Sequence, residues 1–396
     1  MAEDGRGDGG RLSCRPDVTM TRVMVLTTHA ERIGGIERVT RTLLRCLSDH
    51  HGPERVGVLS VWAQTTDQPC VVLYSGRGRD GGRVGLRSRV AFIVHAVLGA
   101  LRWRRGLVVI ACHPHLAPVA WLITSLIGAP FVVWCHGEEV WGRIRSTVAW
   151  TMRRADVVFA PSRFTAGRVE QTIGLRTGAV HVIPHCIPPE VAHITPTEAF
   201  DSRRVVTVAR LAPEHAYKGV DELVRAWPRV VAVVDGAELL IVGDGPDRPR
   251  LQGLVHDLAI DASVRFAGAV NDDALASHYS NASLFALPSR TRIGPHPEGE
   301  GFGLVYIEAA AAGLPSVALR GGAVSEVVVD GVTGVLVDSA APDDLSTAII
   351  GLLTDVERAR RLGDAAQRRA AEEYGYDRFC DRVGSLIASL RARPDT

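Results

Sequence analysis

The chain has 396 residues, which is more than a single hydrophobic core usually organises, so we expect two domains. Hydrophobic residues make up 46% of the chain and charged residues 22%, which excludes extensive disorder, a collagen and a membrane bundle. The net charge of +1 gives no reason to expect a nucleic-acid partner.

The N-terminal stretch, residues 1–20, is rich in Gly, Arg and Asp and has no apolar run. We predict a disordered tail rather than a signal peptide, with Met20 as an alternative start. The seven cysteines include no CxxC pair, which favours reduced thiols in a cytoplasmic protein.

Short apolar runs alternate with helical patterns along the whole chain, which predicts parallel α/β units. Several runs are apolar throughout, as strands covered on both faces should be. The predicted strands are residues 22–28, 55–61, 107–112, 130–135, 156–160 and 180–184 in the first half, and 203–209, 238–242, 263–267, 283–287, 315–319 and 334–338 in the second.

A proline-containing stretch without periodicity separates the two sets of strands. We therefore predict a first domain at 21–190, a linker at 191–202, a second domain at 203–370 and, at 371–396, a helix that crosses back to the first domain. The expected fold is α/β, with two doubly wound Rossmann-like domains facing across a cleft. Ligands of such sheets bind at the carboxyl ends of the strands, so the cleft is the expected active site.

Two apolar stretches could be mistaken for membrane segments. Residues 116–135 carry no charge, but Pro118 and the Gly128-Ala129-Pro130 turn divide them into a short helix and a strand of a buried core. Residues 83–105 have Arg at both ends and would suit an anionic membrane surface, but a core helix with solvated ends is the favoured interpretation.

Two glycines and two cations mark the first turns after predicted strands. Gly34 and Gly35 precede an amphipathic helix, where backbone N–H groups can approach a phosphate, although a tight turn explains them equally well. Arg210 and Lys218 flank the start of another helix, where a cation opposes the macrodipole unless an anion binds there. Lys218 is the single lysine among 45 basic residues, which favours a function for it over a solvated surface charge.

Glycine turns and carboxylates in the second domain add to this pattern. The Gly243-Asp244-Gly245 turn could form a wall of a nucleotide pocket or serve packing alone. Glu300 lies in a glycine-rich loop and Glu308 lies in the helix that we expect to start near Leu304. Such a pair can accept hydrogen bonds from sugar hydroxyls while the N–H groups of the turn face a phosphate.

Histidines give weaker signals. His136 follows a predicted strand at its carboxyl end and either faces the cleft or is a satisfied turn histidine. No His or Cys spacing matches a zinc site, so we predict no metal.

These residues and motifs resemble glycosyltransferase family 4, whose members are retaining enzymes with the GT-B fold. The resemblance is strongest from Arg203 to Asp338, and the EGEGFGLVYIE stretch looks particularly like that of bacterial phosphatidylinositol mannosyltransferases. The chain departs from the family at His185-Cys186, where Asn-Gly is usual, and in a longer spacing before Lys218.

The resemblance implies roles for individual residues. Arg210, Lys218 and the Gly35 N–H would neutralise the donor diphosphate, and Glu308 would hold the ribose. Glu300 would bind the donor sugar, helped by the backbone of Phe302, Gly303 and Leu304, and His136 would reach the sugar from the first domain. The base would lie between Gly243 and the turn that ends at Val270.

The expected reaction is transfer of a hexosyl group from a UDP- or GDP-linked sugar to a hydroxyl acceptor, with retention of configuration and without a metal or bound cofactor. The acceptor stays open between a natural-product scaffold, a polyol and a lipid-linked glycan. The alternatives are a nucleotide-sugar-binding protein without transferase activity and a nucleotide-sugar epimerase on the same fold. We expect a bacterial cytoplasmic protein, with peripheral contact to the inner face of the membrane left open.

Overall fold

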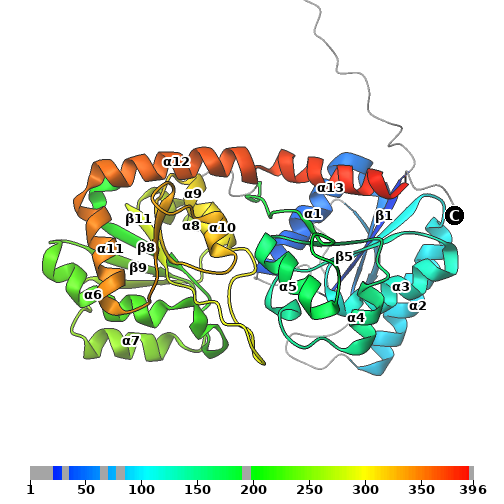
Figure 1. Cartoon of the computed structure of the whole chain (residues 1–396), viewed down its shortest axis with the longest axis horizontal. Coiled ribbons are helices and arrows are strands. Elements are labelled where there is room, and N and C mark those ends of the chain that lie inside the picture. Colours follow the sequence, from blue (N-terminus) through cyan, green and yellow to red (C-terminus); the bar gives the residue numbers. More distant parts are fainter. Residues whose placement is uncertain (1–20, 29–34, 63–69, 77–84, 190–197, 392–396) are drawn as a thin grey trace, which may run out of the picture.

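The computed structural model describes residues 21–28, 35–62, 70–76, 85–189 and 198–391. The predicted tail, residue Gly34 and most of the predicted linker therefore lie outside the described residues. The described chain forms two α/β units, each built around one parallel sheet, that lie side by side (Figure 1).

The first unit is built around a seven-stranded sheet in the order β3-β2-β1-β4-β5-β6-β7. Its strands are buried almost throughout, except for the edge strands β3 and β7. The strands are β1 (Arg22–Thr27), β2 (Val56–Ser60), β3 (Val71–Ser75), β4 (Leu107–Ala111), β5 (Phe131–Trp134), β6 (Val157–Ala160) and β7 (His181–Val182). The helices are α1 (Gly35–His51), α2 (Leu86–Trp103), α3 (Ala117–Ile127), α4 (Ser146–Met152) and α5 (Arg163–Ile173), with 3₁₀ turns η2 (Pro53–Arg55), η3 (Pro114–Leu116) and η4 (Glu138–Val140).

The second unit has a six-stranded sheet in the order β10-β9-β8-β11-β12-β13. The strands are β8 (Arg204–Val208), β9 (Glu238–Val242), β10 (Val264–Gly268), β11 (Leu284–Leu287), β12 (Ser316–Leu319) and β13 (Gly334–Val337). The helices are α6 (Val220–Val233), α7 (Arg248–Asp257), α8 (Asp272–Ser280), α9 (Leu304–Ala311), α10 (Val324–Val327), α11 (Pro342–Thr354) and α12 (Val356–Tyr374), with 3₁₀ turns η5 (Phe200–Ser202) and η6 (Pro213–Lys218).

Helix α13 (Tyr376–Arg391) continues almost directly from α12 and lies on the first unit, so the two helices run along one side of both units (top of Figure 1). It packs against α1, where Gly384 lies beside His50 and the Tyr376 hydroxyl donates to Asp49 over 2.7 Å. Phe379, Val383 and Ile387 of α13 belong to the same core as β1 and α1.

All predicted strands are present, but one strand was missed. β3 lies at the sheet edge, where its side chains are only partly buried. Residues 70–74 form an apolar run like those of the central strands, so β3 was missed although its sequence has the same pattern. In both sheets the first β-strand of the unit lies in the middle, which places the strand-to-helix turns after β1, β4, β8 and β11 close to the cleft.

The two apolar stretches have different outcomes. Residues 116–135 form α3 and the buried strand β5, as predicted. The preference for a core helix at 83–105 was wrong, because α2 buries one face through Phe92, Ala96 and Trp103 and exposes an apolar stripe on the other. No helix in the described part of the chain is long and apolar enough to cross a membrane.

Candidate active site in the cleft between the domains

The N-termini of two helices, one from each domain, meet in the cleft. α1 begins at Gly35 and α9 begins at Leu304. A Cβ atom on Gly35 would lie 3.7 Å from Leu304 Cδ1, so the first turns of the two helices are in contact range. Helix N-termini carry unpaired N–H groups and a partial positive charge, so their convergence creates a place for an anion.

The start of α9 requires glycine. Gly303 is the N-cap of the helix and has φ +97°, and its Cβ would lie 2.7 Å from the Tyr306 ring. No side chain caps this end of α9, while the preceding Phe302 is buried. The backbone around Gly303 is therefore fixed by packing, with its N–H groups left for another partner.

Lys218 and Glu300 form an ion pair at the edge of the second sheet. Lys218 Nζ lies 2.6 Å from Glu300 Oε1, and the same oxygen accepts a hydrogen bond from the Ser289 hydroxyl over 3.1 Å. The two charged side chains are only 16% and 12% exposed. Gly219 follows Lys218 with φ +75°, and any side chain there would overlap the carbonyl of Pro288. This close approach brings η6 against the segment that carries Ser289.

Further charged groups surround this pair. Arg210 is exposed after β8, and burial together with Lys218 and Arg210 lowers the pKa of His215. From the first domain, Glu138 faces the same cluster: burial, Glu139 and Glu300 raise its pKa, while Lys218 lowers it. The cluster thus combines two cations of the second domain with carboxylates from both domains.

Glu308 lies on α9 and is the most buried carboxylate of the cleft, with its side chain 1% exposed. Arg38 Nη1 of α1 donates to Glu308 Oε1 over 2.7 Å, and the Tyr279 hydroxyl donates to Oε2 over 3.3 Å. Burial raises the pKa of Glu308, while Arg38 and Tyr279 act in the opposite direction. Glu308 and Lys218 therefore lie in two separate clusters of the same domain.

His136 is buried beside the cleft rather than exposed in it. Its Nε2 lies 2.9 Å from the Cys112 carbonyl oxygen, and its Nδ1 has no partner among the described residues. Burial lowers the pKa of His136 to about 4, so the ring is neutral at physiological pH. Its ring centroid lies 5.9 Å from that of His185, which in turn contacts Phe302 of the other domain.

Gly243, which was assigned from the sequence to the base-binding wall together with Val270, has a packing role. Its N–H donates to the Gly268 carbonyl over 2.8 Å, its φ is +125°, and a Cβ there would overlap the carbonyl of Ala209. Val270 is partly buried against the second core. The Gly243 N–H is therefore already paired within the turn.

The glycine-rich loop of the second domain contacts the first domain directly. A Cβ on Gly301 would overlap the His136 carbonyl oxygen and lie 2.8 Å from Gly137 Cα. The Gly301 carbonyl accepts hydrogen bonds from Ser162 over 2.9 Å and from Thr165 over 3.1 Å. The cleft is therefore closed at Gly301, immediately beside Glu300.

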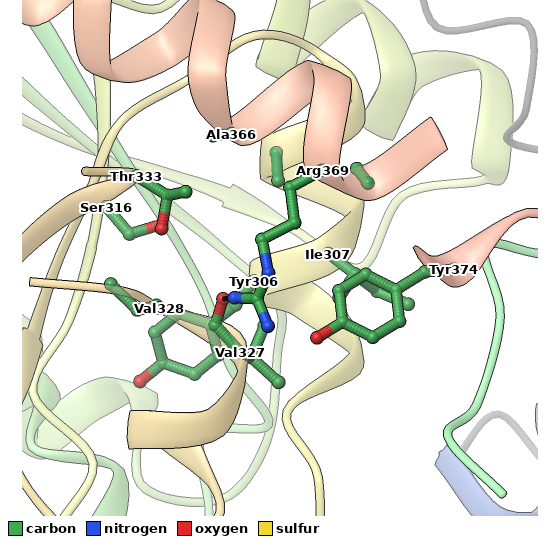
Figure 2. Close-up of a pocket in the computed structure, with 11 residues that line it drawn as sticks. Tyr306, Ile307, Ser316, Val327, Val328, Thr333, Ala366, Arg369 and Tyr374 are labelled. Carbon is green, nitrogen blue, oxygen red and sulfur yellow. Dashed lines mark hydrogen bonds between the residues drawn. The ribbon is translucent and has the colours of Figure 1, made fainter. Parts of the chain in front are cut away.

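A small cavity lies away from the cleft, between α9, α10 and α12 (Figure 2). Arg369 projects into it from α12 and donates to the carbonyls of Val327 over 2.6 Å and Glu326 over 2.8 Å. The Glu326 carboxylate caps the N-terminus of α5 in the first domain, accepting from the N–H groups of Arg163 and Phe164 over 2.9 and 2.7 Å. Arg369 thus lies beside an interdomain contact and holds the backbone of the residue that makes it.

Within the described ranges, no three His, Cys, Asp or Glu side chains are grouped so that they could hold a metal ion.

Comparison with known proteins identifies the class of enzyme. Residues 33–191 match the family described as Glycosyltransferase Family 4, and residues 195–369 match Glycosyl transferases group 1. A GDP-mannose-dependent alpha-(1-6)-phosphatidylinositol monomannoside mannosyltransferase of Mycolicibacterium smegmatis is 34% identical over 65% of this chain and 69% of its own length. The chain belongs to glycosyltransferase family 4.

Other similar proteins agree with this assignment. The corresponding mannosyltransferase of Mycobacterium tuberculosis is 32% identical over 64% of this chain and 68% of its own length. The Anabaena protein HepE, solved with UDP, superimposes with a TM-score of 0.75 at 17% identity, covering 93% of this chain and all of its own. Sucrose-phosphate synthase of Thermosynechococcus elongatus has the same TM-score at 21% identity, over 94% of this chain and 99% of its own. The family-4 glycosyltransferase therefore has the GT-B fold, as expected from the sequence.

Several cleft residues of this glycosyltransferase were missed in the sequence. Arg38 reaches Glu308 through a long-range contact, whereas Ser289 and His215 lie close in sequence to Glu300 and to Lys218. Nothing in the local sequence of these three residues distinguishes them. Glu138 lies two residues after His136, and its place after a buried strand was the available signal. Among the predicted residues, Arg210 and Lys218 share one cluster with Glu300, whereas Glu308 and His136 lie apart from it.

Proposed function

We propose that the enzyme transfers a hexosyl group from a nucleoside diphosphate sugar to a hydroxyl acceptor, with retention of the anomeric configuration. The observation that carries this proposal is the Lys218–Glu300 ion pair, closed over by the His136–Gly137 segment. The pair places a cation, which suits a diphosphate, next to a hydrogen-bond acceptor, which suits the hydroxyl groups of a sugar joined to that diphosphate.

The leaving diphosphate is stabilised by fixed positive charge. Arg210 and Lys218 neutralise its oxygens, and the N-termini of α1 and α9 contribute backbone N–H groups and helix dipoles. Because the chain itself supplies this charge, the reaction needs no divalent metal. Charge that builds up as the bond between the sugar and the phosphate breaks is the main target of catalysis.

The two glutamates have different tasks in the donor subsite. Glu300, oriented by Lys218 and Ser289, accepts hydrogen bonds from the hydroxyls of the transferred sugar. Glu308 accepts from the ribose hydroxyls of the nucleotide. His136, neutral and with Nδ1 unpaired among the described residues, borders the sugar from the acceptor side.

Retention follows from attack on the same face that the leaving group departs from. The acceptor hydroxyl enters beside the diphosphate, its oxygen bonds to the anomeric carbon, and its proton passes to the departing phosphate oxygen. Closure of the domains at Gly301 excludes water, which limits hydrolysis of the donor. A transferase explains a cleft that closes against the first domain more directly than a binding protein without catalysis or an epimerase does.

GDP-mannose is the donor that we propose to test first, because the most similar relatives reported above are named as GDP-mannose-dependent enzymes. The acceptor that we propose is lipid-linked, and the enzyme would work at the inner face of the cytoplasmic membrane. The support for this is α2, whose exposed face carries apolar side chains between arginines.

Donor profiling tests the proposed function. Purified enzyme is incubated with GDP-mannose and with UDP- and GDP-linked glucose, and release of the nucleoside diphosphate is measured with and without mannosylated phosphatidylinositol and soluble polyols. Proton NMR of the product linkage reads the anomer, and a chelator arm tests the metal. Absence of acceptor-dependent release with every donor, or an inverted product, would contradict the proposal.

A further inference from the structure

Arg38 is a charged residue of the cleft with no role in the function proposed above. It lies in the first turn of α1, on the acceptor-side domain, and its side chain is 17% exposed. A cation in the first turn of a helix opposes the macrodipole, so its position is unfavourable unless carboxylates offset it. Two carboxylates do so, and both belong to the other domain.

One guanidinium links α1 to two helices of the nucleotide-binding domain. Nη1 donates to Glu308 of α9 over 2.7 Å, and Nη2 pairs with Asp272 in the first turn of α8. The Asp272 side chain is about half exposed, whereas that of Glu308 is 1% exposed, so the two ion pairs of Arg38 differ in burial. The planar fork of Arg fixes its orientation on both partners, which the point charge of Lys cannot do.

The Glu308 carboxylate has acceptor positions left for further hydrogen bonds. Glu308 Oε1 accepts from Arg38 and Oε2 accepts from Tyr279, whereas an ionised carboxylate has about four acceptor positions. Because Glu308 is so deeply buried in the closed cleft, a nucleotide reaches it only while the domains are apart. Closure then returns Arg38 to Glu308 with the ribose beside both.

We propose that Arg38 is a positioning residue of the donor subsite, which orients the Glu308 carboxylate toward the ribose and couples ribose binding to domain closure. The proposal rests on the proposed function, because it takes Glu308 as the ribose ligand. A carboxylate only accepts hydrogen bonds and a guanidinium only donates them, so together they match a hydroxyl group, which does both.

The charge balance around Glu308 supports this role. The groups that face it are Arg38 from α1, and Tyr279 and Asp272 from α8. Burial raises the pKa of Glu308, Arg38 and Tyr279 lower it, and Asp272 raises it. Without Arg38 the pKa of Glu308 is higher, so the carboxyl takes up a proton at a higher pH and stops accepting from the ribose.

Nucleotide binding to variants tests the proposal. The full-length protein is titrated with GDP, UDP and their 2′-deoxy and 3′-deoxy analogues by calorimetry, from about pH 5.5 to about pH 8. The variants are Arg38→Met, Arg38→Lys and, as a control that weakens another interdomain contact, Glu326→Gln. The phosphates of the ligand titrate alike with every variant, so differences between variants at one pH isolate the protein groups.

In Arg38→Met we expect an affinity for the ribonucleotide that is lower by roughly tenfold, in line with the loss of a hydrogen bond to a charged group. The preference for the ribonucleotide over its deoxy analogues should shrink, and the pH below which affinity falls should move up. Arg38→Lys should restore the pH dependence, because it keeps a positive charge beside Glu308. Glu326→Gln should change neither the ribose preference nor the pH dependence.

The outcomes separate two failures. Wild-type protein that binds neither GDP nor UDP overturns the proposed function, and this inference with it. If the wild-type protein binds a nucleotide and Arg38→Met keeps the same ribose preference and pH dependence, the inference about Arg38 is overturned and the proposed function is not. Tighter binding in Arg38→Met would also overturn it, since Arg38 would then compete with the ribose. Thermal unfolding of each variant identifies any loss of affinity that comes from unfolding.

Discussion

Lys218 is the residue on which the proposed chemistry depends most directly. Lys218→Ala removes a charge-assisted contact to the diphosphate and leaves Glu300 with only Ser289. Such a contact is worth about 1.5–3 kcal/mol, so kcat/KM should fall roughly ten- to a hundredfold. Lys218→Arg should recover only part of the loss, because the bulkier planar head does not fit a site shaped for Lys.

Steady-state kinetics with the best donor measure this effect. Arg229→Ala is a matched control, since Arg229 lies on α6 in an exposed ion pair with Asp343 and should leave kcat/KM unchanged. Wild-type kinetics in Lys218→Ala would mean that the diphosphate is bound elsewhere.

Buried histidines make the stability depend on pH. Burial lowers the pKa of His113 and His136 to about 4 each, and that of His185 well below its ordinary value. The unfolded chain takes up protons on these groups near pH 6.5 and the folded chain does not. Stability is therefore lost as pH falls from about 6.5 toward 4, by up to about 1.4 kcal/mol per pH unit for each histidine.

Thermal unfolding at a series of pH values measures this loss. His185→Asn removes one of the titrating rings, so the slope of the free energy of unfolding against pH should be shallower than in the wild type. An unchanged slope would show that His185 is not buried in its neutral form. The comparison of slopes is unaffected by any constant loss of packing in the variant.

The sequence identified some residues of the candidate site but not the contacts between them. Lys218 and Glu300 each stood out, one by composition and one by its glycine loop, but their ion pair joins positions 82 residues apart. Arg38 could not be identified, because one surface arginine looks like any other in a chain with 45 basic residues. Its role depends on α1 facing α8 and α9, which only the packing of the two domains determines.

At the scale of elements, apolar runs predicted the central strands because those strands are covered on both faces. β3 was missed although residues 70–74 are apolar as well, and its edge position leaves its side chains only partly buried. The prediction of a core helix was wrong for α2, where apolar residues occupy both faces and the sequence alone does not say which face the sheet covers. The buried face proved to be the one with Phe92 and Ala96.

α2 should bind anionic membranes through its other face. Five apolar side chains spaced three or four residues apart are 47–77% exposed: Leu86, Val90, Val94, Leu98 and Leu101. The exposed Arg87, Arg89, Arg102, Arg104 and Arg105 flank them, and α2 carries no acidic residue. Insertion of the apolar face together with attraction of the arginines to anionic lipid should hold the enzyme at a membrane surface.

Vesicle sedimentation tests this with phosphatidylcholine vesicles and with vesicles that also contain phosphatidylglycerol. Exchanging Val94 and Leu98 for Gln should reduce binding to the anionic vesicles roughly thirtyfold, at about 1 kcal/mol for each partly inserted side chain. Val233→Gln, an equally exposed apolar residue on α6, is the control. Binding that survives the double exchange would assign the membrane contact to another surface or to none.

At the scale of the whole molecule, catalysis depends on closure, and closure depends on the absence of a side chain at Gly301. A Cβ there would overlap the His136 carbonyl oxygen and come within 2.8 Å of Gly137 Cα, both of which are backbone atoms that cannot step aside. Gly301→Ala should therefore hold the domains slightly apart. Each domain keeps its own sheet and core, so the melting temperature should change little.

The expected consequence of Gly301→Ala is separation of binding from turnover. Arg210, Lys218 and Glu300 all belong to one domain, so nucleoside diphosphate binding should persist, weakened by no more than the loss of the contacts from α1. Misplacement of the acceptor side should lower kcat about a hundredfold. Small-angle scattering with bound nucleotide should show a larger radius of gyration than for the wild type. Gly253→Ala, in the middle of α7 with nothing within 4 Å of the added atom, should leave activity and shape unchanged. If Gly301→Ala turns over normally, contact at Gly301 is not part of the catalytic state, and the cleft must work in a more open form.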